Sequence, residues 1–257
     1  MNSSQKTKPG SSIEPGTIWQ LGAHRLAFGD ARNPELLGRL VGKEKINLVC
    51  SDVPYATSAV ESKRNFRPLS KDKVIEGDHL QDDNSYQEFN RAWLQAIIPH
   101  LAKKNSCYVF NSDKMVWPLR QALIGCGFKV SQLLIWVKSQ AVVGRLDYAP
   151  AHELILYSWF GTHTFRHSKD RSVIFYPRPS HSPLHPTTKP IGLVRRLILN
   201  SSKIGDTVYD GFLGSGTSLL ACEQTKRKCL AVEIDLEYCL TAIRQWERLT
   251  NLTATKV

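Results

Sequence analysis

Short apolar segments alternate with amphipathic segments along most of the chain, and this alternation most constrains the fold. INLVCSD (46–52) is apolar almost throughout, as expected of a strand buried on both faces of a parallel sheet. PELLGRLVG (34–42) instead repeats its apolar side chains at helical spacing. Strands that alternate with helices predict an α/β protein with a doubly wound, mostly parallel sheet. The other predicted strands are 24–30, 106–111, 130–138, 153–160, 207–212 and 228–235, and the other predicted helices are 85–102, 116–127, 190–202, 218–226 and 236–249.

The length and composition favour one large domain rather than two small ones. The chain has 257 residues, of which 42% are hydrophobic, and this is enough for one packed core. Residues 1–15 are polar and are predicted to be a flexible tail, so the domain spans 16–257. Residues 56–84 and 161–187 lack clear periodicity, and long irregular segments inside a domain are usually functional or disordered. We expect the first of these two segments to be a mobile loop.

The excess of basic residues narrows the choice of partner. The formal net charge is +11. Such a charge favours a polyanion, with nucleic acid ahead of an anionic membrane surface. Many basic proteins are simply soluble, so charge alone does not decide between these alternatives.

The cysteines and the apolar runs are typical of a cytoplasmic protein. None of the six cysteines forms a CxxC pair and several lie in apolar runs, which predicts reduced, buried thiols rather than disulfides or a zinc site. We therefore expect no metal. No apolar run is long enough to span a bilayer, and residues 1–12 lack the apolar core of a signal peptide. We expect no membrane contact.

A glycine-rich loop, DGFLGSGTS (210–218), lies between a predicted strand and a predicted helix. Glycine lets the backbone approach a ligand, and the helix N-terminus offers free N–H groups. A P-loop is disfavoured because Thr217 stands where its lysine belongs. A nucleoside-cofactor loop fits better, because Glu233 ends the next strand about 20 residues on, where an acid can bind ribose hydroxyls. Asp210 suits a cationic amine better than a pyrophosphate, which favours S-adenosylmethionine over a dinucleotide; a plain tight turn is the weaker alternative.

SDVPY (51–55) ends another predicted strand on an acid. An exocyclic base amine is a poor nucleophile because its lone pair is conjugated with the ring, and two acceptors for its N–H groups localise that lone pair. Asp52 and the carbonyl of Val53 can be these acceptors. Pro54 stiffens the turn and Tyr55 can stack on a base, which must first leave the duplex. Taken alone, the motif would favour a plainer reading, with Asp52 as a helix cap and Tyr55 in the core.

Together these segments resemble the amino-methylating DNA methyltransferases, which modify adenine N6 or cytosine N4. That family usually carries Asp-Pro-Pro-Tyr and Phe-x-Gly-x-Gly, where this chain has DVPY and FLGSG. HPTTKP (185–190) and GDARNPELLGRL (29–40) resemble further family segments, while WVKSQAVVGRLDY and HELILYSW resemble a phage- and plasmid-borne branch. The likeness spans about residues 14–250. The catalytic motif comes first and the cofactor loop last, as in the β group, and unlike glutamine methylases and most RNA methylases.

The resemblance implies a Rossmann-like class I methyltransferase fold, with a doubly wound, mostly parallel seven-stranded sheet, an antiparallel edge hairpin and a circularly permuted motif order. It implies S-adenosylmethionine as cofactor and a flipped base of double-stranded DNA as substrate. Glu233 would bind the ribose, Asp30 would lie near the adenine, and Asp210 with Lys189 near the methionine end. The implied cofactor residues are Asp30, Ala31, Asp52, Lys189, Asp210, Phe212, Gly214, Ser215, Gly216, Thr217, Glu233 and Ile234.

The residue at position 52 and two departures from the family pattern bear on the reaction. Aspartate there resembles the adenine enzymes more than the cytosine ones, which more often carry serine, so we favour adenine N6 with cytosine N4 as the alternative. Val53 replaces the first proline, and Gly211 stands where proline is usual. Both changes fit an active but slower enzyme, and both also fit a relative that only binds DNA. An RNA or protein amide methylase is disfavoured by the motif order and by Asp52.

Basic residues outside these motifs are candidates for DNA contacts. Residues 161–187 lie where the family keeps its target-recognition segment, and they combine basic and aromatic side chains that could hold phosphates and surround a flipped base. The segment is short, so we predict a short recognition site; a solvated surface is the plainer reading of each residue alone. The resemblance allows a homodimer and places the protein at a bacterial nucleoid, encoded by host or phage. The candidates are Lys63, Arg64, Lys138, Arg145, Arg166, Lys169, Arg171 and Arg178.

Overall fold

Strands and helices alternate along the chain as the sequence predicts. The computed structural model describes residues 13–55, 82–139, 141, 147–166, 170–177 and 189–257. The strands are β1 (Ile18–Leu21), β2 (His24–Phe28), β3 (Ile46–Asp52), β4 (Leu101–Asn111), β5 (Phe128–Val137), β6 (His152–Phe160), β7 (Thr162–His163), β8 (Val173–Phe175), β9 (Thr207–Asp210), β10 (Lys228–Glu233) and β11 (Thr255–Lys256). The helices are α1 (Pro34–Val41), α3 (Asp83–Ile97), the 3-10 turn η1 (Ile98–His100), α4 (Val116–Gly125), α5 (Ile191–Ser201), α6 (Thr217–Thr225) and α7 (Leu236–Thr250).

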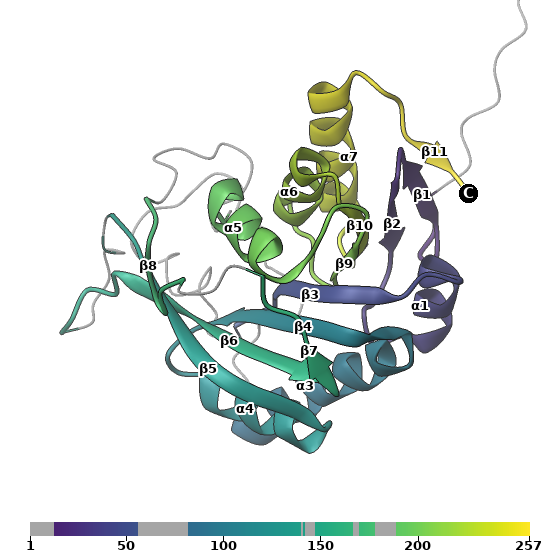
Figure 1. Ribbon diagram of the computed structural model, residues 1–257. Helices are drawn as coiled ribbons and strands as arrows, with labels where there is room; N and C mark the ends of the chain where they lie inside the picture. The colour runs from purple at the N-terminus through teal and green to yellow at the C-terminus, as the bar shows by residue number, and fades with distance from the viewer. Residues whose placement is uncertain (1–12, 56–81, 140, 142–146, 167–169, 178–188) are drawn as a thin grey trace, which may run out of the picture.

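One mixed sheet carries helices on both of its faces (Figure 1). Among the described residues it has eleven strands, in the order β11-β1-β2-β10-β9-β3-β4-β6-β5-β8, with β7 paired to β4 off this path. The seven strands from β2 to β5 in this order are the predicted sheet. Neighbours are parallel from β2 to β4, whereas β6 is antiparallel to both β4 and β5. The short strands β1, β11, β7 and β8 were not predicted, because two to four residues are too few for a periodic pattern.

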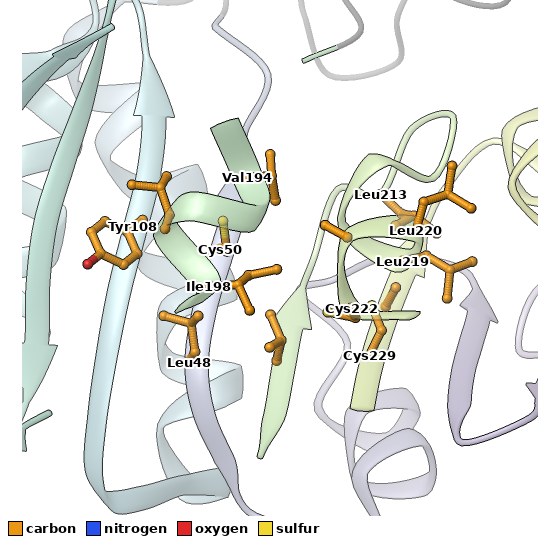
Figure 2. Close-up of a cluster of buried hydrophobic side chains, with 14 of the residues drawn as sticks. Leu48, Cys50, Tyr108, Val194, Ile198, Leu213, Leu219, Leu220, Cys222 and Cys229 are labelled. Carbon is orange, nitrogen blue, oxygen red and sulfur yellow. The ribbon is translucent and has the colours of Figure 1, made fainter. Parts of the chain in front are cut away.

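Apolar side chains on the two faces of the sheet form two cores. On one face they pack against α5, α6 and α7, and on the other against α1, α3 and α4 (Figure 1). Figure 2 shows part of the first core, where Leu48 and Cys50 of β3 lie near Val194 and Ile198 of α5. Each fully buried aliphatic side chain contributes about 1.5–3 kcal/mol. The cysteines of this core are free thiols, as predicted, among them Cys50 and Cys222.

The order in which strands are added to the sheet reverses between β9 and β3. These two strands pair in parallel, with Val49 opposite Tyr209, although they are far apart in the sequence. From β9 the chain crosses through α6 to β10 on one side, and from β3 it crosses through α3 to β4 on the other. Such a reversal opens a crevice at the carboxyl ends of the strands, where ligands bind in α/β folds. Asp210 and Asp52 end these two strands and therefore face the crevice.

Several predicted boundaries need correction. The helix α3 begins at Asp83 rather than at the predicted residue 85, because Asp82 caps it by accepting from the amides of Asn84 and Ser85. The predicted loop 56–84 therefore ends earlier, and its residues 56–81 lie outside the described part of the chain, as do residues 1–12 of the predicted tail. The predicted helix 85–102 stops at Ile97, because Pro99 and the 3-10 turn interrupt it. Within the described ranges, no helix combines the length and apolar character needed to cross a membrane.

Candidate active site

The catalytic acid predicted from the sequence lies at the end of β3. Lys189, which directly precedes the cap of α5, donates from its Nζ to Asp52 Oδ2 at 2.6 Å. The other oxygen, Oδ1, is buried and accepts no hydrogen bond from the residues that the structure describes. A buried acceptor without a donor is costly. An incoming N–H group would therefore be stabilised at Oδ1.

Asp52 belongs to a network of charged side chains that are largely buried. Glu153 of β6 accepts Lys189 Nζ on Oε2 at 3.1 Å and Lys138 Nζ on Oε1 at 2.7 Å. The hydroxyl of Tyr55 also donates to Glu153 Oε2, at 2.9 Å. Two carboxylates thus alternate with two ammonium groups, so the network is formally neutral.

The network sets the ionisation of its members. Burial raises the pKa of Asp52, while the ammonium group of Lys189 opposes that rise. Burial also disfavours the charge of Glu153, but Lys189 and Lys138 outweigh it and lower the pKa to about 2. Burial alone would lower the pKa of Lys189, yet the two carboxylates raise it. Glu153 and Lys189 therefore stay charged at neutral pH.

Side chains from α3 and β4 hold the loop after Asp52 in place. Tyr86 of α3 donates from its hydroxyl to the carbonyl oxygen of Pro54 at 2.8 Å, and Asn111 of β4 donates to that hydroxyl at 2.8 Å. Val53 is buried in the core on the side of α3. The ring of Tyr55 lies 5.1 Å from Lys189 Nζ. An apolar valine therefore fits where the family usually has proline, and the turn is held by hydrogen bonds rather than by a second proline ring.

The glycine loop adopts the conformation that its sequence predicts. Gly214 and Gly216 have φ of 55° and 104°, a region that L side chains rarely adopt. A Cβ at Gly216 would lie 3.0 Å from Ala242 Cβ, so this glycine also allows α7 to pack closely. A Cβ at Gly214 would meet no atom within 4 Å, so the backbone there borders open space. The helix α6 begins directly after Gly216.

Two acids beside this loop are buried. Glu233 accepts from the amides of Gly214 at 2.6 Å and Asp235 at 2.9 Å. Burial raises its pKa to about 7. Asp210 accepts from the amide of Phe212 at 3.0 Å, and burial raises its pKa to about 6. Both acids gain charge near neutral pH, at the place where a cationic or hydroxyl-bearing ligand would meet them.

Gly211 replaces the usual proline for a reason visible in the structure. Its amide donates to Ser51 Oγ at 3.1 Å, which ties the loop to β3 and which proline could not do. A Cβ at this position would also lie 3.1 Å from the hydroxyl oxygen of Tyr209 and 3.2 Å from Ala31 Cβ. The start of the loop is therefore held by a hydrogen bond and by close packing.

A small cavity opens at the crevice between β9 and β3. Seven predicted cofactor residues line it, and five further lining residues were not predicted. Those five are mostly apolar, and nothing in the local pattern separates them from core residues. The predicted ones are Asp52, Lys189, Asp210, Phe212, Gly214, Ser215 and Thr217, and the others are Cys50, Phe110, Val194, Leu213 and Ser218.

The remaining predicted cofactor residues lie outside this lining. Glu233 reaches the loop through Gly214, and Gly216 caps α6. Ala31 is buried, and Ile234 is partly exposed next to Glu233. Asp30 binds the guanidinium group of Arg32 with both oxygens, at 2.6–3.0 Å. A carboxylate that binds a guanidinium group still has lone pairs that can accept further hydrogen bonds. Contact between Asp30 and the adenine of the cofactor therefore stays a proposal.

The structure corrects one predicted DNA contact. Lys138 is buried and its ammonium group binds Glu153, so it is not available to a phosphate on the surface. Arg166 and Arg171 are exposed, and their DNA contacts stay predictions. The remaining candidates Lys63, Arg64, Arg145, Lys169 and Arg178 lie outside the described residues.

Sequence reasoning missed the residues that support Asp52 and Tyr55 from other elements. Glu153, Tyr86 and Asn111 have no motif of their own. The one usable signal was Glu153, a lone acid near the start of the apolar strand HELILYSW. An acid in such a position needs a buried partner. In the described part of the chain, no group of three or more metal-ligating side chains is found.

Comparison with known proteins decides the family. The family model described as DNA methylase, of the N6 and N4 type, matches residues 46–174 and 158–244. The chain belongs to the N6/N4 DNA methylase family. Type II methyltransferase M.HpaI of Haemophilus parainfluenzae is 27% identical over 222 residues, which are 76% of this chain and 66% of that protein. Type II methyltransferase M2.DpnII of Streptococcus pneumoniae is 24% identical over 224 residues, 79% of this chain and 83% of the relative.

Solved structures give the same fold. The M1.HpyAVI–SAM complex superposes with a TM-score of 0.63 and 22% identity, over 86% of this chain and 98% of that one. PvuII DNA methyltransferase, which is cytosine-N4-specific, superposes with a TM-score of 0.70 and 16% identity, over 90% of this chain and 88% of that one. The fold is therefore the predicted Rossmann-like class I methyltransferase fold.

S-adenosylmethionine is the cofactor of this methylase, and the residues present fit it. The open backbone at Gly214 leaves room for a nucleoside, and Glu233 offers a carboxylate next to it. Asp210 supplies a second carboxylate on the cavity wall, as an amine-bearing ligand requires. Phe212 and Leu213 also line the cavity, and their side chains are apolar.

Proposed function

We propose that this methylase transfers a methyl group to N6 of adenine in double-stranded DNA. The observation that carries the proposal is Asp52, a half-buried carboxylate with one oxygen held by Lys189 and the other without a donor among the described residues. An aspartate at this position resembles the motif of the family's adenine enzymes more than that of its cytosine enzymes. Cytosine N4 is the alternative outcome of the test below.

The chain prepares the base amine for methylation. The flipped base would donate one N–H to Asp52 Oδ1 and the other to the carbonyl oxygen of Val53. These bonds localise the nitrogen lone pair and aim it at the cavity. Tyr55 would stack on the base, held by its bond to Glu153. The amine loses one proton as the new N–C bond forms, and Asp52, whose pKa burial raises, is placed to accept it.

The cofactor has its own set of residues. When bound, S-adenosylmethionine supplies an electrophilic methyl group and becomes the neutral thioether S-adenosylhomocysteine. Glu233 would hold the ribose hydroxyls, and Asp210 the amino group. Ile234, Ala31 and Asp30 would border the adenine. The complete set of proposed cofactor-binding residues is the one that the family resemblance implies, and Lys189 in this set acts through Asp52.

The proposed binding of DNA is supported by the positive charge of the chain. The net charge of +11 favours a polyanion. Exposed Arg166 and Arg171, in the predicted target-recognition segment, would bind phosphates. A homodimer remains a proposal, and sedimentation of the protein alone and with DNA tests it.

Replacement of Asp52 by alanine tests the proposed chemistry. We expect methyl transfer to fall by at least about 10²–10³-fold, as when one preorganised group is removed from an active site. Binding of DNA should persist. Asp113→Ala, which changes an exposed acid after β4, is the matched control. If the Asp52→Ala variant and the wild type methylate DNA equally, the proposed role of Asp52 is wrong.

A further inference from the structure

Glu153 gathers three side chains from three separate segments of the chain. Its Oε1 accepts Lys138 Nζ at 2.7 Å, from the end of β5. Its Oε2 accepts both Lys189 Nζ at 3.1 Å and the hydroxyl of Tyr55 at 2.9 Å. The side chain is only 16% exposed. Glu153 does not itself line the cavity, and it contacts the lining through Lys189.

Two of these partners have roles in the proposed reaction. Tyr55 is the proposed platform for the base, and Lys189 holds Oδ2 of the catalytic acid. One oxygen of Glu153 therefore links the platform to the acid. Lys138 anchors the other oxygen, which fixes the rotation of the Glu153 carboxylate.

The geometry also explains why Oδ1 of Asp52 is left without a donor. The ammonium group of Lys189 is shared between Asp52 and Glu153, so part of its bonding capacity is directed away from Asp52. An ammonium group is a compact point charge with three donors. Without Glu153, the donors of Lys189 that now bind Glu153 would become available to Asp52.

We propose, on the basis of the proposed function, that Glu153 is a positioning residue: it holds Lys189 on one oxygen of Asp52 and Tyr55 over the base site. Oδ1 of Asp52, which has no donor among the described residues, and the ring of Tyr55 are thereby held in fixed positions relative to each other. Glu153 makes no contact with the reacting atoms and acts through its partners.

Titration of Asp52 tests this link without any DNA. The groups facing Asp52 are Lys189, Glu153 and Tyr55, with Asp210 on the neighbouring strand β9 and the Cys50 thiol on β3 itself. In protein labelled with ¹³C-carboxyl aspartate, the Asp52 signal is assigned by its absence from Asp52→Asn. We expect Glu153→Gln to lower the pKa of Asp52, because a neighbouring negative charge is lost and Lys189 turns to Asp52 alone. An unchanged pKa overturns the proposal.

Kinetics test the consequence. We expect Glu153→Gln to lower the single-turnover rate of methyl transfer by up to about 100-fold, as a small misplacement of reacting groups can do. Cofactor affinity should stay within about twofold, since Glu153 does not line the cavity. The acid limb of the rate profile should move to lower pH. Glu223→Gln is the control, because Glu223 is also a partly buried acid with two donors, His24 and Trp246, but on α6.

Tyr55→Phe keeps the proposal testable if Glu153→Gln does not fold. This variant keeps the ring and all charges and removes the hydroxyl, which donates to Glu153 and also interacts with Asp52. We expect a lower methylation rate with unchanged cofactor binding, and no further loss when it is combined with Glu153→Gln. A wild-type rate in Tyr55→Phe, or equal losses of rate and cofactor affinity in Glu153→Gln, would contradict a positioning role. If the wild type methylates no DNA, the proposed function fails, while the Asp52 titration still decides the role of Glu153.

Discussion

The two carboxylate oxygens of Asp52 have different surroundings, and this difference is what makes the residue useful. Oδ2 is bound by Lys189, whereas Oδ1 has no donor among the described residues. Val53 contributes its carbonyl to the proposed site and its side chain to the core. The sequence predicted Asp52, Gly214 and Glu233 because their roles depend on local motifs. It could not predict Glu153, whose partner Tyr55 is 98 residues away in the chain.

Replacement of Val53 by proline tests whether the departure from the family motif limits the rate. Proline fixes φ and reduces the freedom of the unfolded chain by about 0.4–1 kcal/mol. If ordering of the turn at residue 53 also limits catalysis, the methylation rate of the proline variant should rise by at most about fivefold. The reaction is measured in single turnover, with Val53→Ala as the control for lost packing. A larger rise would mean that the wild-type turn is poorly formed.

The pKa values of Asp210 and Glu233 predict how cofactor binding responds to pH. Burial raises them to about 6 and about 7, so both groups take up protons as the pH falls below neutral. If the cofactor binds the charged forms, its affinity falls as the pH falls, by about tenfold per unit for each proton that must leave. Calorimetry at pH 8 and pH 5.5, in buffers of different ionisation enthalpy, measures both affinity and proton release. Glu233→Gln should remove the step near pH 7, and an affinity independent of pH would argue against these two contacts.

At the level of elements, each part of the site lies where a strand ends or a helix begins. Asp52 and Asp210 end β3 and β9, Glu233 ends β10, and Lys189 precedes the cap of α5. This arrangement follows from the parallel order of the strands, which the alternating pattern predicted. The short strands β7 and β8 and the start of α3 were not predicted correctly, because they depend on pairing and capping rather than on periodicity.

The cap of α1 links helix stability to the cofactor site. Asn33 accepts from the amides of Glu35 at 3.0 Å and Leu36 at 3.2 Å, directly after the segment with Asp30 and Ala31. Asn33→Ala should lower the free energy of unfolding by about 1 kcal/mol, whereas Asn33→Asp should leave it nearly unchanged, since aspartate caps equally well. Chemical denaturation measures both. Weaker cofactor binding in the alanine variant alone would support a role of this segment at the adenine.

At the scale of the whole molecule, the sequence predicted the family, the fold and the order of the motifs. The central seven strands and their helices reproduce that prediction. Positive charge is the other global property, because the chain carries 34 basic and 23 acidic side chains. Such an excess favours DNA without specifying a sequence.

The salt dependence of DNA binding tests the two exposed arginines. Each phosphate contact that is lost should reduce the slope of log affinity against log salt by about 0.9. We therefore expect Arg166→Ala with Arg171→Ala to weaken binding on all sequences and to reduce the slope by about 1.8. Arg120→Ala, on α4 at the opposite face of the sheet, is the control. An unchanged slope in the double variant would mean that the segment does not contact the backbone of DNA.

The most direct test of adenine methylation is transfer from labelled S-adenosylmethionine to unmethylated double-stranded DNA, followed by digestion to nucleosides and mass analysis. We predict N6-methyladenine as the product, with none formed by the Asp52→Ala variant. N4-methylcytosine would keep the roles of Asp52 and Val53 and change the base. The absence of any methylated nucleoside, from a protein that binds both cofactor and DNA, would contradict the proposed catalysis.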